Sequence, residues 1–228
     1  MLACNCYVLA PRQGADAIVV DPGQRAMAPL RRVFDENRLT PAAVLLTHGH
    51  IDHIWSAQKV SDTYGCPTYI HPADRFMLTD PLRSLGTLPG QALVGALSKM
   101  MFSEPKQLVE LDGDTQTIGL AETTVIVEPT PGHTRGSVVF RVHGVDRFMN
   151  GVAADLPAAG VVFTGDTLFK NSVGRTDLPG GSGRDLMHSL VGKLLTLEDA
   201  TVVLPGHGPT TTIGAERRHN PFLEGLTA

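Results

Sequence analysis

The chain has 228 residues, of which 42% are hydrophobic, and a formal net charge of −4. This suits a single globular domain over residues 1–228, and the acidic balance disfavours nucleic-acid and membrane partners. No apolar run reaches the roughly 20 residues that a membrane helix needs. With three cysteines and no secretory signal, the sequence predicts a cytoplasmic protein with reduced thiols, and its oligomeric state is left open.

Apolar or β-branched runs alternate along the chain with helical patterns, as expected of a layered α/β protein. Ser182 and Asp185 stand in the spacing of a helix cap before the last of these helical patterns. The predicted helices cover about 25–39, 52–64 and 183–197, and the predicted strands cover 6–10, 17–21, 42–47, 67–70, 123–128, 137–142, 160–165 and 201–205.

Two segments interrupt this alternation and are predicted to be insertions. Residues 72–106 carry helical pieces between prolines, and residues 143–160 separate two predicted strands. Either segment can form a lid near a site or a packing elaboration of the fold, and we favour packing for both.

Four predicted strands end in a short turn that presents a histidine or an aspartate. AVLLT is followed by His48, TTVIVEPTPG by His133, GVVFTG by Asp166 and TVVLPG by His207. Layered α/β proteins assemble their sites at such strand ends. One strand-end histidine would more often be structural, but the same arrangement occurs four times, and this favours a metal site.

The first of these turns carries the most ligand-type side chains. His48 and His50 are two residues apart in an extended turn, so both rings can point the same way. Asp52 and His53 begin the next helix, where adjacent side chains diverge by roughly 100° and need not aim at the same place. Two clusters predict two divalent metals, which the carboxylate of Asp166 can bridge. Imidazole and carboxylate ligands without thiolate suit zinc, iron or manganese, and we favour zinc.

THGHIDH at 47–53, PGHT at 131–134, TGDTLF at 164–169 and PGHGP at 205–209 resemble the motifs of the metallo-β-lactamase fold superfamily. The resemblance covers nearly the whole chain, in order. It implies an αββα four-layer sandwich with the metals at one edge of the two sheets. It also implies a first metal held by His48, His50 and His133, a second held by Asp52, His53 and His207, and Asp166 as the bridge.

Within the superfamily, TGDTLFKNSVGRTDLPGG at 164–181 and the tail TTIGAERRHNPF at 211–222 resemble glyoxalase II-like (hydroxyacylglutathione hydrolase-like) enzymes. The implied function is a binuclear hydrolase that cleaves a thioester such as S-lactoylglutathione with a metal-bound hydroxide, which Asp52 orients. Asp166 stands where a true β-lactamase would have a cysteine. Full-length glyoxalase II enzymes carry a further helical domain, whereas this chain ends soon after His207, so the identity of the thiol carrier stays open.

Two other enzymes remain open on the same residues. An iron-dependent persulfide dioxygenase would hold its metal with His48, His133 and Asp166, a 2-His-1-carboxylate set with open positions for oxygen. A lactone or phosphoester hydrolase of the same fold would use the binuclear centre. A non-enzymatic, metal-stabilised member is disfavoured because all seven ligand positions are filled.

Arg175 is the predicted substrate-binding residue. It lies in the glycine-rich segment NSVGRTDLPGG, which follows Asp166 and should therefore reach the rim of the site. A guanidinium can hold a carboxylate of a glutathione-like thiol through two parallel hydrogen bonds. The alternative is an ion pair with Asp177 that stiffens the loop, and the sequence favours neither.

Overall fold

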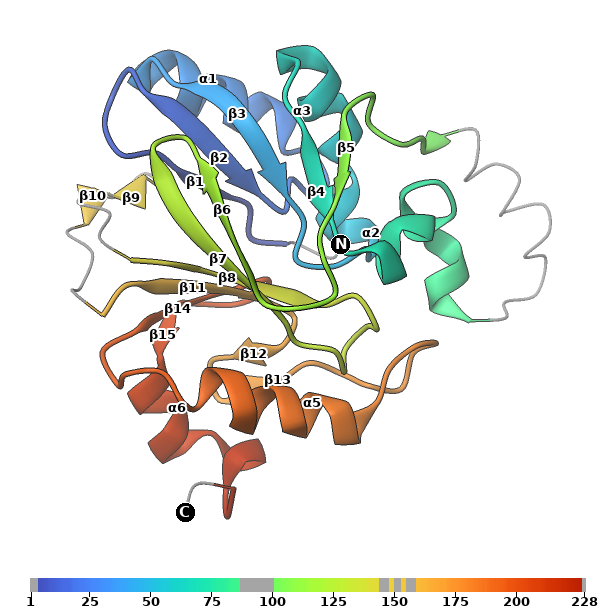
Figure 1. Ribbon diagram of the computed structural model, residues 1–228, viewed down its shortest axis with the longest axis vertical. Helices are drawn as coiled ribbons and strands as arrows, with labels where there is room; N and C mark the ends of the chain where they lie inside the picture. Colours follow the sequence, from blue (N-terminus) through green and yellow to red (C-terminus); the bar gives the residue numbers. More distant parts are fainter. Residues whose placement is uncertain (1–3, 87–100, 144–147, 150–152, 155–158, 227–228) are drawn as a thin grey trace.

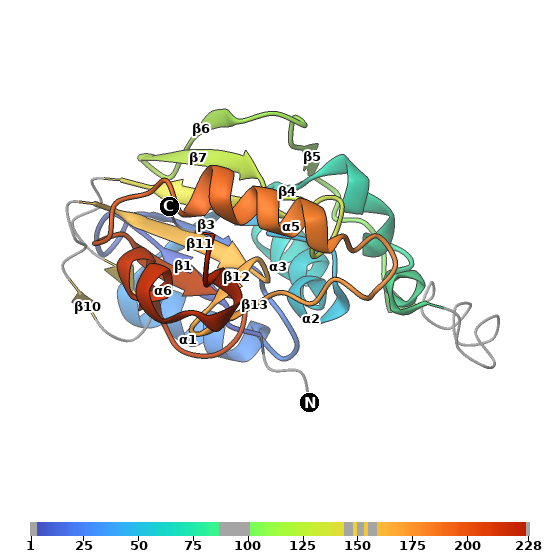
Figure 2. The same ribbon diagram turned by 90° about the horizontal axis from the view of Figure 1, so that it is seen from below.

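Two sheets pack face to face, with helices on both outer surfaces (Figures 1 and 2). The structure is a computed structural model that describes residues 4–86, 101–143, 148–149, 153–154 and 159–226. The arrangement is the αββα four-layer sandwich implied by the motifs.

The first sheet is mixed, with antiparallel pairs on one side and parallel pairs on the other. Its described strands follow the order β10-β9-β1-β2-β3-β4-β5, in which β2 to β5 run parallel and β1 antiparallel to β2. The carboxyl ends of β2 and β3 therefore lie at one edge. The strands are β1 (Tyr7–Leu9), β2 (Asp16–Val20), β3 (Thr40–Leu45), β4 (Thr68–Ile70), β5 (Leu108–Glu110), β9 (Phe148–Met149) and β10 (Ala153–Ala154).

The second sheet has the described order β15-β14-β11-β8-β7-β6. Strand β8 is antiparallel to both β7 and β11, and β11 is parallel to β14, so β7, β11 and β14 end at the same edge. The strands are β6 (Gln116–Leu120), β7 (Thr123–Pro129), β8 (Val138–Val142), β11 (Val161–Gly165), β14 (Val202–Pro205) and β15 (Thr211–Thr212); β12 (Leu168–Phe169) and β13 (Ser172–Val173) form a separate ladder.

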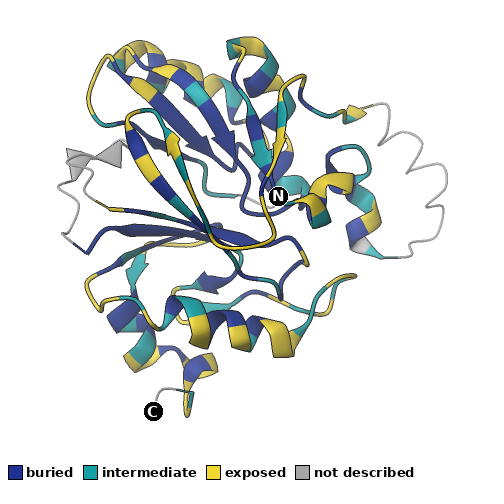
Figure 3. Ribbon diagram, in the orientation of Figure 1, coloured by how far each residue is buried: buried dark blue, intermediate teal, exposed yellow. Residues whose placement is uncertain are grey.

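Successive side chains of the inner strands point to opposite faces of the sheet and pack into two separate hydrophobic cores. Val8 and Val19 face the helices that cover the first sheet, whereas Tyr7, Ile18 and Val20 face the second sheet. Both faces of these strands are buried, which explains their unbroken apolar sequences. Figure 3 shows the same contrast between buried strands and the exposed outer sides of the helices.

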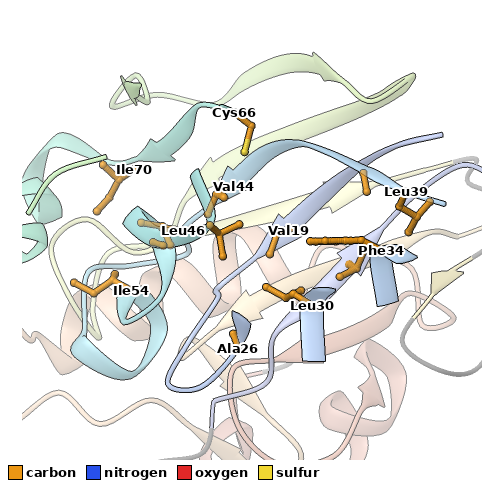
Figure 4. Packing of buried hydrophobic residues seen from close by; sticks show 14 of the residues in the cluster. Val19, Ala26, Leu30, Phe34, Leu39, Val44, Leu46, Ile54, Cys66 and Ile70 are labelled. Carbon is orange, nitrogen blue, oxygen red and sulfur yellow. The ribbon is translucent and has the colours of Figure 1, made fainter. Parts of the chain in front are cut away.

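Helices α1 (Met27–Asn37) and α3 (Ala57–Tyr64) cover the first sheet. Leu30 and Phe34, four residues apart on α1, pack with Val19 and Val44 of the sheet (Figure 4). Burying each such side chain stabilises the fold by about 1.5–3 kcal/mol.

On the second sheet lie α5 (Gly183–Ser189), which continues into the π-helical turn η3 (Leu190–Leu194), and α6 (Ile213–His219). The Ser182 hydroxyl accepts a hydrogen bond from the backbone N–H of Asp185, as the cap spacing predicts. The apolar stripe of Leu186, Leu190 and Leu194 is buried against the sheet.

The helix predicted at 52–64 is two helices, α2 (Ile51–Ile54) and α3, with a break at Ser56. The Ser56 backbone N–H donates to the carbonyl of Pro22 and its hydroxyl donates to the carbonyl of Gly23. These bonds tie the chain to the loop after β2 and interrupt the helix. Helix α3 ends at Gly65, as predicted, with a left-handed φ of 67°.

Of the predicted insertion at 72–106, the structure describes two short 3₁₀ helices, η1 (Pro72–Leu78) and η2 (Pro81–Leu85), and residues 101–106. The predicted insertion at 143–160 lies largely outside the described residues. No helix in the described part of the chain is long and apolar enough to cross a bilayer.

Candidate metal centre

The turns after β3, β7, β11 and β14 bring all seven predicted ligands together at one edge of the sandwich. Their side chains fall into two interlocking groups with one carboxylate in contact with both. This geometry is the one that the motifs imply, while the role of each residue as a ligand stays a prediction.

His48, His50 and His133 form the first set. One ligand atom from each ring lies within 4.8 Å of the others, and Nδ1 of His50 is 2.8 Å from Nε2 of His133. Burial, with a smaller contribution from the neighbouring histidines, lowers the pKa of all three imidazoles, to about 4 for His50. The rings are therefore neutral at neutral pH, which is the form that binds a metal.

Asp52, His53 and His207 form the second set. Nε2 of His207 lies 3.3 Å from Oδ2 of Asp52 and 3.3 Å from Nε2 of His53. Burial alone would raise the pKa of Asp52, but the hydrogen bond with His207 and the charge of His53 hold it at about 2. Asp52 is therefore an ionised carboxylate at neutral pH.

The carboxylate of Asp166 contacts both sets. Its Oδ1 lies 3.3 Å from Nε2 of His53, and its Oδ2 lies 3.6 Å from Nε2 of His133 and 3.5 Å from Nε2 of His207. The preceding Gly165 has a left-handed φ of 48°, and a Cβ there would collide with the turn after β3. Glycine at this position therefore allows the strand to end close to the first ligand turn.

Asp21 orients one histidine of each set. Its Oδ1 accepts from the backbone N–H of Thr47 at 2.8 Å, and its Oδ2 accepts from Nδ1 of His53 at 2.9 Å and from the Thr47 hydroxyl at 2.6 Å. That hydroxyl in turn lies 3.1 Å from Nδ1 of His48. Without a metal, burial lowers the pKa of His53, but the nearby acidic groups Cys4, Asp166 and Asp21 outweigh burial and raise it, so the ring is protonated. With a metal bound, we assign Nδ1–H tautomers to both rings on this network, which would leave both Nε2 lone pairs for the metal.

Sequence reasoning missed Asp21, although it carries the same signal as the predicted ligands. It ends the run AIVV and precedes Pro22 and Gly23, so it too is an acidic residue presented by a strand-end turn. It was counted as the last residue of the predicted strand, while β2 ends one residue earlier.

Arg175 reaches the centre through its backbone. Its carbonyl accepts a hydrogen bond from Nδ1 of His133 at 2.8 Å, which leaves Nε2 of that ring for a metal. Its guanidinium forms two 2.7 Å hydrogen bonds with Asp177, and both side chains are exposed. The structure thus contains the ion pair given as the alternative, while Arg175 also lines the pocket described below.

Cys4 lies beside the centre and forms a further group of ligand-type atoms with Asp21 and His53, all within 4.8 Å of one another. Its sulfur is 3.4 Å from Nδ1 of His53, on the side of the ring that faces Asp21. Burial raises the pKa of the Cys4 thiol to about 11, so the sulfur stays protonated at neutral pH. This agrees with the predicted reduced thiols, and a thiol is a poor ligand compared with a thiolate.

The residues fit a pair of divalent ions. Among the described residues, the buried Nε2 atoms of His48 and His50 have no hydrogen-bond partner. Leaving a buried acceptor unsatisfied costs about 1–3 kcal/mol, and a bound cation would remove that cost. A set of imidazoles and carboxylates suits zinc, iron or manganese.

A pocket of about 410 Å³ opens onto the centre. Candidate ligand residues form part of its lining, and apolar residues form much of the rest. Its size suits a small molecule rather than a polymer. The residues other than candidate ligands that line it are Ile51, Phe169, Val173, Arg175 and Leu178.

Related sequences span nearly the whole chain. The chain is 66% identical over 227 residues to an uncharacterized protein of Mycobacterium tuberculosis, and the aligned region covers 100% of this chain and 96% of the relative. It is 32% identical over 228 residues to the hydroxyacylglutathione hydrolase GloC of Haemophilus influenzae, with 96% of this chain and 92% of that protein covered.

Solved structures share the fold. The BLEG-1 B3 metallo-beta-lactamase superposes with a TM-score of 0.77 at 36% identity, covering 98% of this chain and 96% of that one. A protein crystallised in a di-iron-bound form gives a TM-score of 0.71 at 33% identity, covering 97% and 96%. A sequence profile of the Metallo-beta-lactamase superfamily matches residues 1–147 and 151–207. With its sandwich fold and its clustered histidines and aspartates, the chain belongs to the metallo-β-lactamase superfamily of metallo-hydrolases.

Proposed function

We propose that the protein is a glyoxalase II-like thioesterase that hydrolyses the thioester of a low-molecular-weight thiol such as S-lactoylglutathione. The observation that carries this proposal is the carboxylate of Asp166, which contacts both ligand sets beneath a pocket of small-molecule size. The 32% identity to a hydroxyacylglutathione hydrolase supports this choice of substrate.

The lining of the pocket favours direct attack by water. Its described residues include no serine, cysteine or lysine that could form a covalent intermediate. Divalent ions, when bound, lower the pKa of water from 15.7 toward about 7 and polarise a carbonyl group. Asp52, ionised and on the pocket wall, accepts a hydrogen bond from the attacking water and so orients it.

The remaining steps need little acid–base chemistry from the chain. A carbon–oxygen bond forms at the carbonyl carbon, the carbon–sulfur bond breaks, and the departing sulfur takes up a proton from the water. A thiolate leaves readily, so no general acid is required. The apolar side chains of Phe169 and Leu178 line the pocket and favour an acyl chain over bulk water.

We expect zinc- or iron-loaded protein to hydrolyse S-lactoylglutathione equally well with and without oxygen, releasing one thiol per acid. The reason is that hydrolysis consumes only water. Thioester absorbance and free thiol would be followed in an anaerobic chamber, with metal-free protein as the control. Oxygen-dependent turnover that yields sulfite from a persulfide would identify the dioxygenase instead, and faster cleavage of a β-lactam or lactone would also contradict the proposal.

Arg175 provides a test of how the thiol carrier is held. If its guanidinium binds a carboxylate of the substrate, Arg175→Ala should raise KM several-fold for anionic thioesters and leave kcat nearly unchanged, because the contact is remote from the reacting carbonyl. Steady-state kinetics with an anionic and a neutral thioester would measure this.

Asp177→Ala is the matched variant, since it frees the guanidinium of Arg175 from its partner. Substrate binding by Arg175 predicts that Asp177→Ala lowers KM for the anionic thioester. Unchanged KM values in both variants, with a lower melting temperature, would leave the ion pair as a purely structural feature of the loop.

A further inference from the structure

Asp74 holds a buried carboxylate in η1, inside the segment predicted to be a packing insertion, and only 1% of the residue is exposed. Its Oδ1 accepts from the backbone N–H of Gly136 at 2.9 Å. Its Oδ2 accepts from the backbone N–H of Gly49 at 2.9 Å and from the hydroxyl of Thr134 at 2.7 Å. The three donors come from two loops that are far apart in the sequence.

These loops carry the whole first ligand set. Gly49 stands between His48 and His50, and Thr134 directly follows His133. The carboxylate therefore connects the turn after β3 to the turn after β7. We propose that Asp74 is a positioning residue that fixes the separation of these two ligand turns, and through it the affinity of the first metal set. This inference rests on the metal dependence of the proposed function.

Hydrogen bonding makes this connection stiff. Burial raises the pKa of Asp74, while its three donors, on Thr134, Gly49 and Gly136, favour the ionised form. Hydrogen bonds to an ionised carboxylate are shorter and stronger than those to a neutral acceptor. Because the carboxylate of Asp74 is buried, no solvent replaces a donor that moves away. A shift of either turn would therefore leave both the carboxylate and a backbone N–H unsatisfied.

Close packing adds a second restraint. A Cβ on Gly136 would lie 2.6 Å from Cγ and Oδ1 of Asp74, and a Cβ on Gly49 would lie 2.8 Å from its backbone oxygen. Both turns thus rest directly on η1 with no side chain between them. The distance between the turns is set by the helix and its carboxylate.

Asp74 acts on the centre without touching substrate. It does not line the pocket over the candidate ligands, but a separate cavity of about 390 Å³ that Thr134 and Arg135 also line. A change at Asp74 should therefore appear in metal affinity and kcat, and not in KM.

The first test is Asp74→Asn, which keeps the shape of the side chain. Whichever way its amide turns, the –NH₂ group opposes a backbone N–H, of Gly136 in one orientation and of Gly49 in the other. Changes to groups that orient metal ligands typically weaken metal affinity or activity by 10–100-fold, and we expect a loss of about this size. Chelator competition would measure the affinity of each site, and the visible spectrum of cobalt-loaded protein would report the ligand geometry.

Two further variants separate positioning from charge. Gly136→Ala retains the carboxylate but pushes a methyl group against it, so it should also weaken one metal site; Gly113→Ala is the matched control, because a Cβ there meets nothing within 4 Å. Thr134→Val removes one donor, whereas Thr134→Ser keeps a hydroxyl and should restore affinity.

Wild-type metal affinity and an unchanged cobalt spectrum in folded Asp74→Asn would overturn the proposal. The proposal would also be overturned if Asp74→Asn lowered the stability of the fold but the folded variant bound both metals with wild-type affinity, because Asp74 would then have a purely structural role. If Asp74→Asn does not fold, Thr134→Val with its serine control decides the question. None of these readouts uses a substrate, so an absence of thioesterase activity would refute the proposed function alone.

Discussion

Replacing Asp166 by asparagine is expected to lower kcat by far more than any change around the ligands. Asp166 approaches His53 with one oxygen and His133 and His207 with the other, so the amide would remove a charge and one donor oxygen shared by both sets. Altering a group that only orients a metal ligand typically lowers metal affinity or activity about 10–100-fold. Loss of this shared group should therefore lower kcat by more than about 100-fold. Both metals should be held less tightly.

Elemental analysis and steady-state kinetics would measure this on protein purified without added metal. Wild-type protein should contain close to two divalent ions per chain, and Asp166→Asn distinctly fewer, with circular dichroism showing an intact fold. Asp114→Asn is the control, because it makes the same chemical change on an exposed residue between β5 and β6. Two tightly held metals and near-native turnover in Asp166→Asn would remove this residue from the bridging role.

The strands that sequence could locate are those buried on both faces. The eight predicted strands correspond to β1, β2, β3, β4, β7, β8, β11 and β14, because a continuous apolar run is a strong signal at any position. The sequence reading missed the two-residue strands β9, β10, β12, β13 and β15, and also β5 and β6, which lie at sheet edges. In β6, QTIGL alternates partly buried with exposed residues and includes Gly119, so its apolar signal is weak.

Helix α6 is not among the predicted helical ranges, for a related reason. Its seven residues, IGAERRH, offer Ile213 as their one large apolar side chain, so no helical stripe stands out. The cap was nevertheless present in the sequence: the Thr212 hydroxyl accepts a hydrogen bond from the backbone N–H of Ala215.

The candidate ligands could be predicted because they stand in the turns after buried strands or, for Asp52 and His53, in the helix that directly follows such a turn, where a local sequence pattern and the topology agree. The residues that support them were harder to find. Asp21 follows the same pattern and was overlooked, whereas Asp74 has no local signal at all. Its partners, Gly49 and Gly136, are 25 and 62 residues away, and only the folded chain brings them together.

The second large effect is expected at Asp21, where asparagine is the informative substitution. Asp21 has a left-handed φ of 48°, which asparagine tolerates and alanine does not, so Asp21→Asn changes the side-chain chemistry alone. The carboxylate accepts three hydrogen bonds, from the Thr47 N–H, the Thr47 hydroxyl and Nδ1 of His53. An amide cannot satisfy all three, because its –NH₂ group must face one set of donors.

Both orientations of that amide are unfavourable, one for the stability of the fold and the other for metal binding. If the amide oxygen faces His53, the buried N–H of Thr47 opposes the –NH₂ group, at a cost of about 1–3 kcal/mol of unfolding free energy. If the amide turns over, His53 loses the acceptor that fixes its tautomer, and its Nε2 can carry the proton instead of binding metal. We therefore expect metal affinity and kcat to fall roughly 10–100-fold, with lower stability in urea.

Thr47→Val distinguishes the two branches of this network. It removes the hydroxyl between Asp21 and His48 but leaves the bond from Asp21 to His53, so it should weaken the first metal set more than the second. Asp21→Asn should weaken the second set at least as much as the first, because His53 loses its direct partner. Chelator competition on both variants would resolve the order. If Asp21→Asn kept wild-type affinity for both metals, the tautomers of His48 and His53 would have to be fixed without this carboxylate.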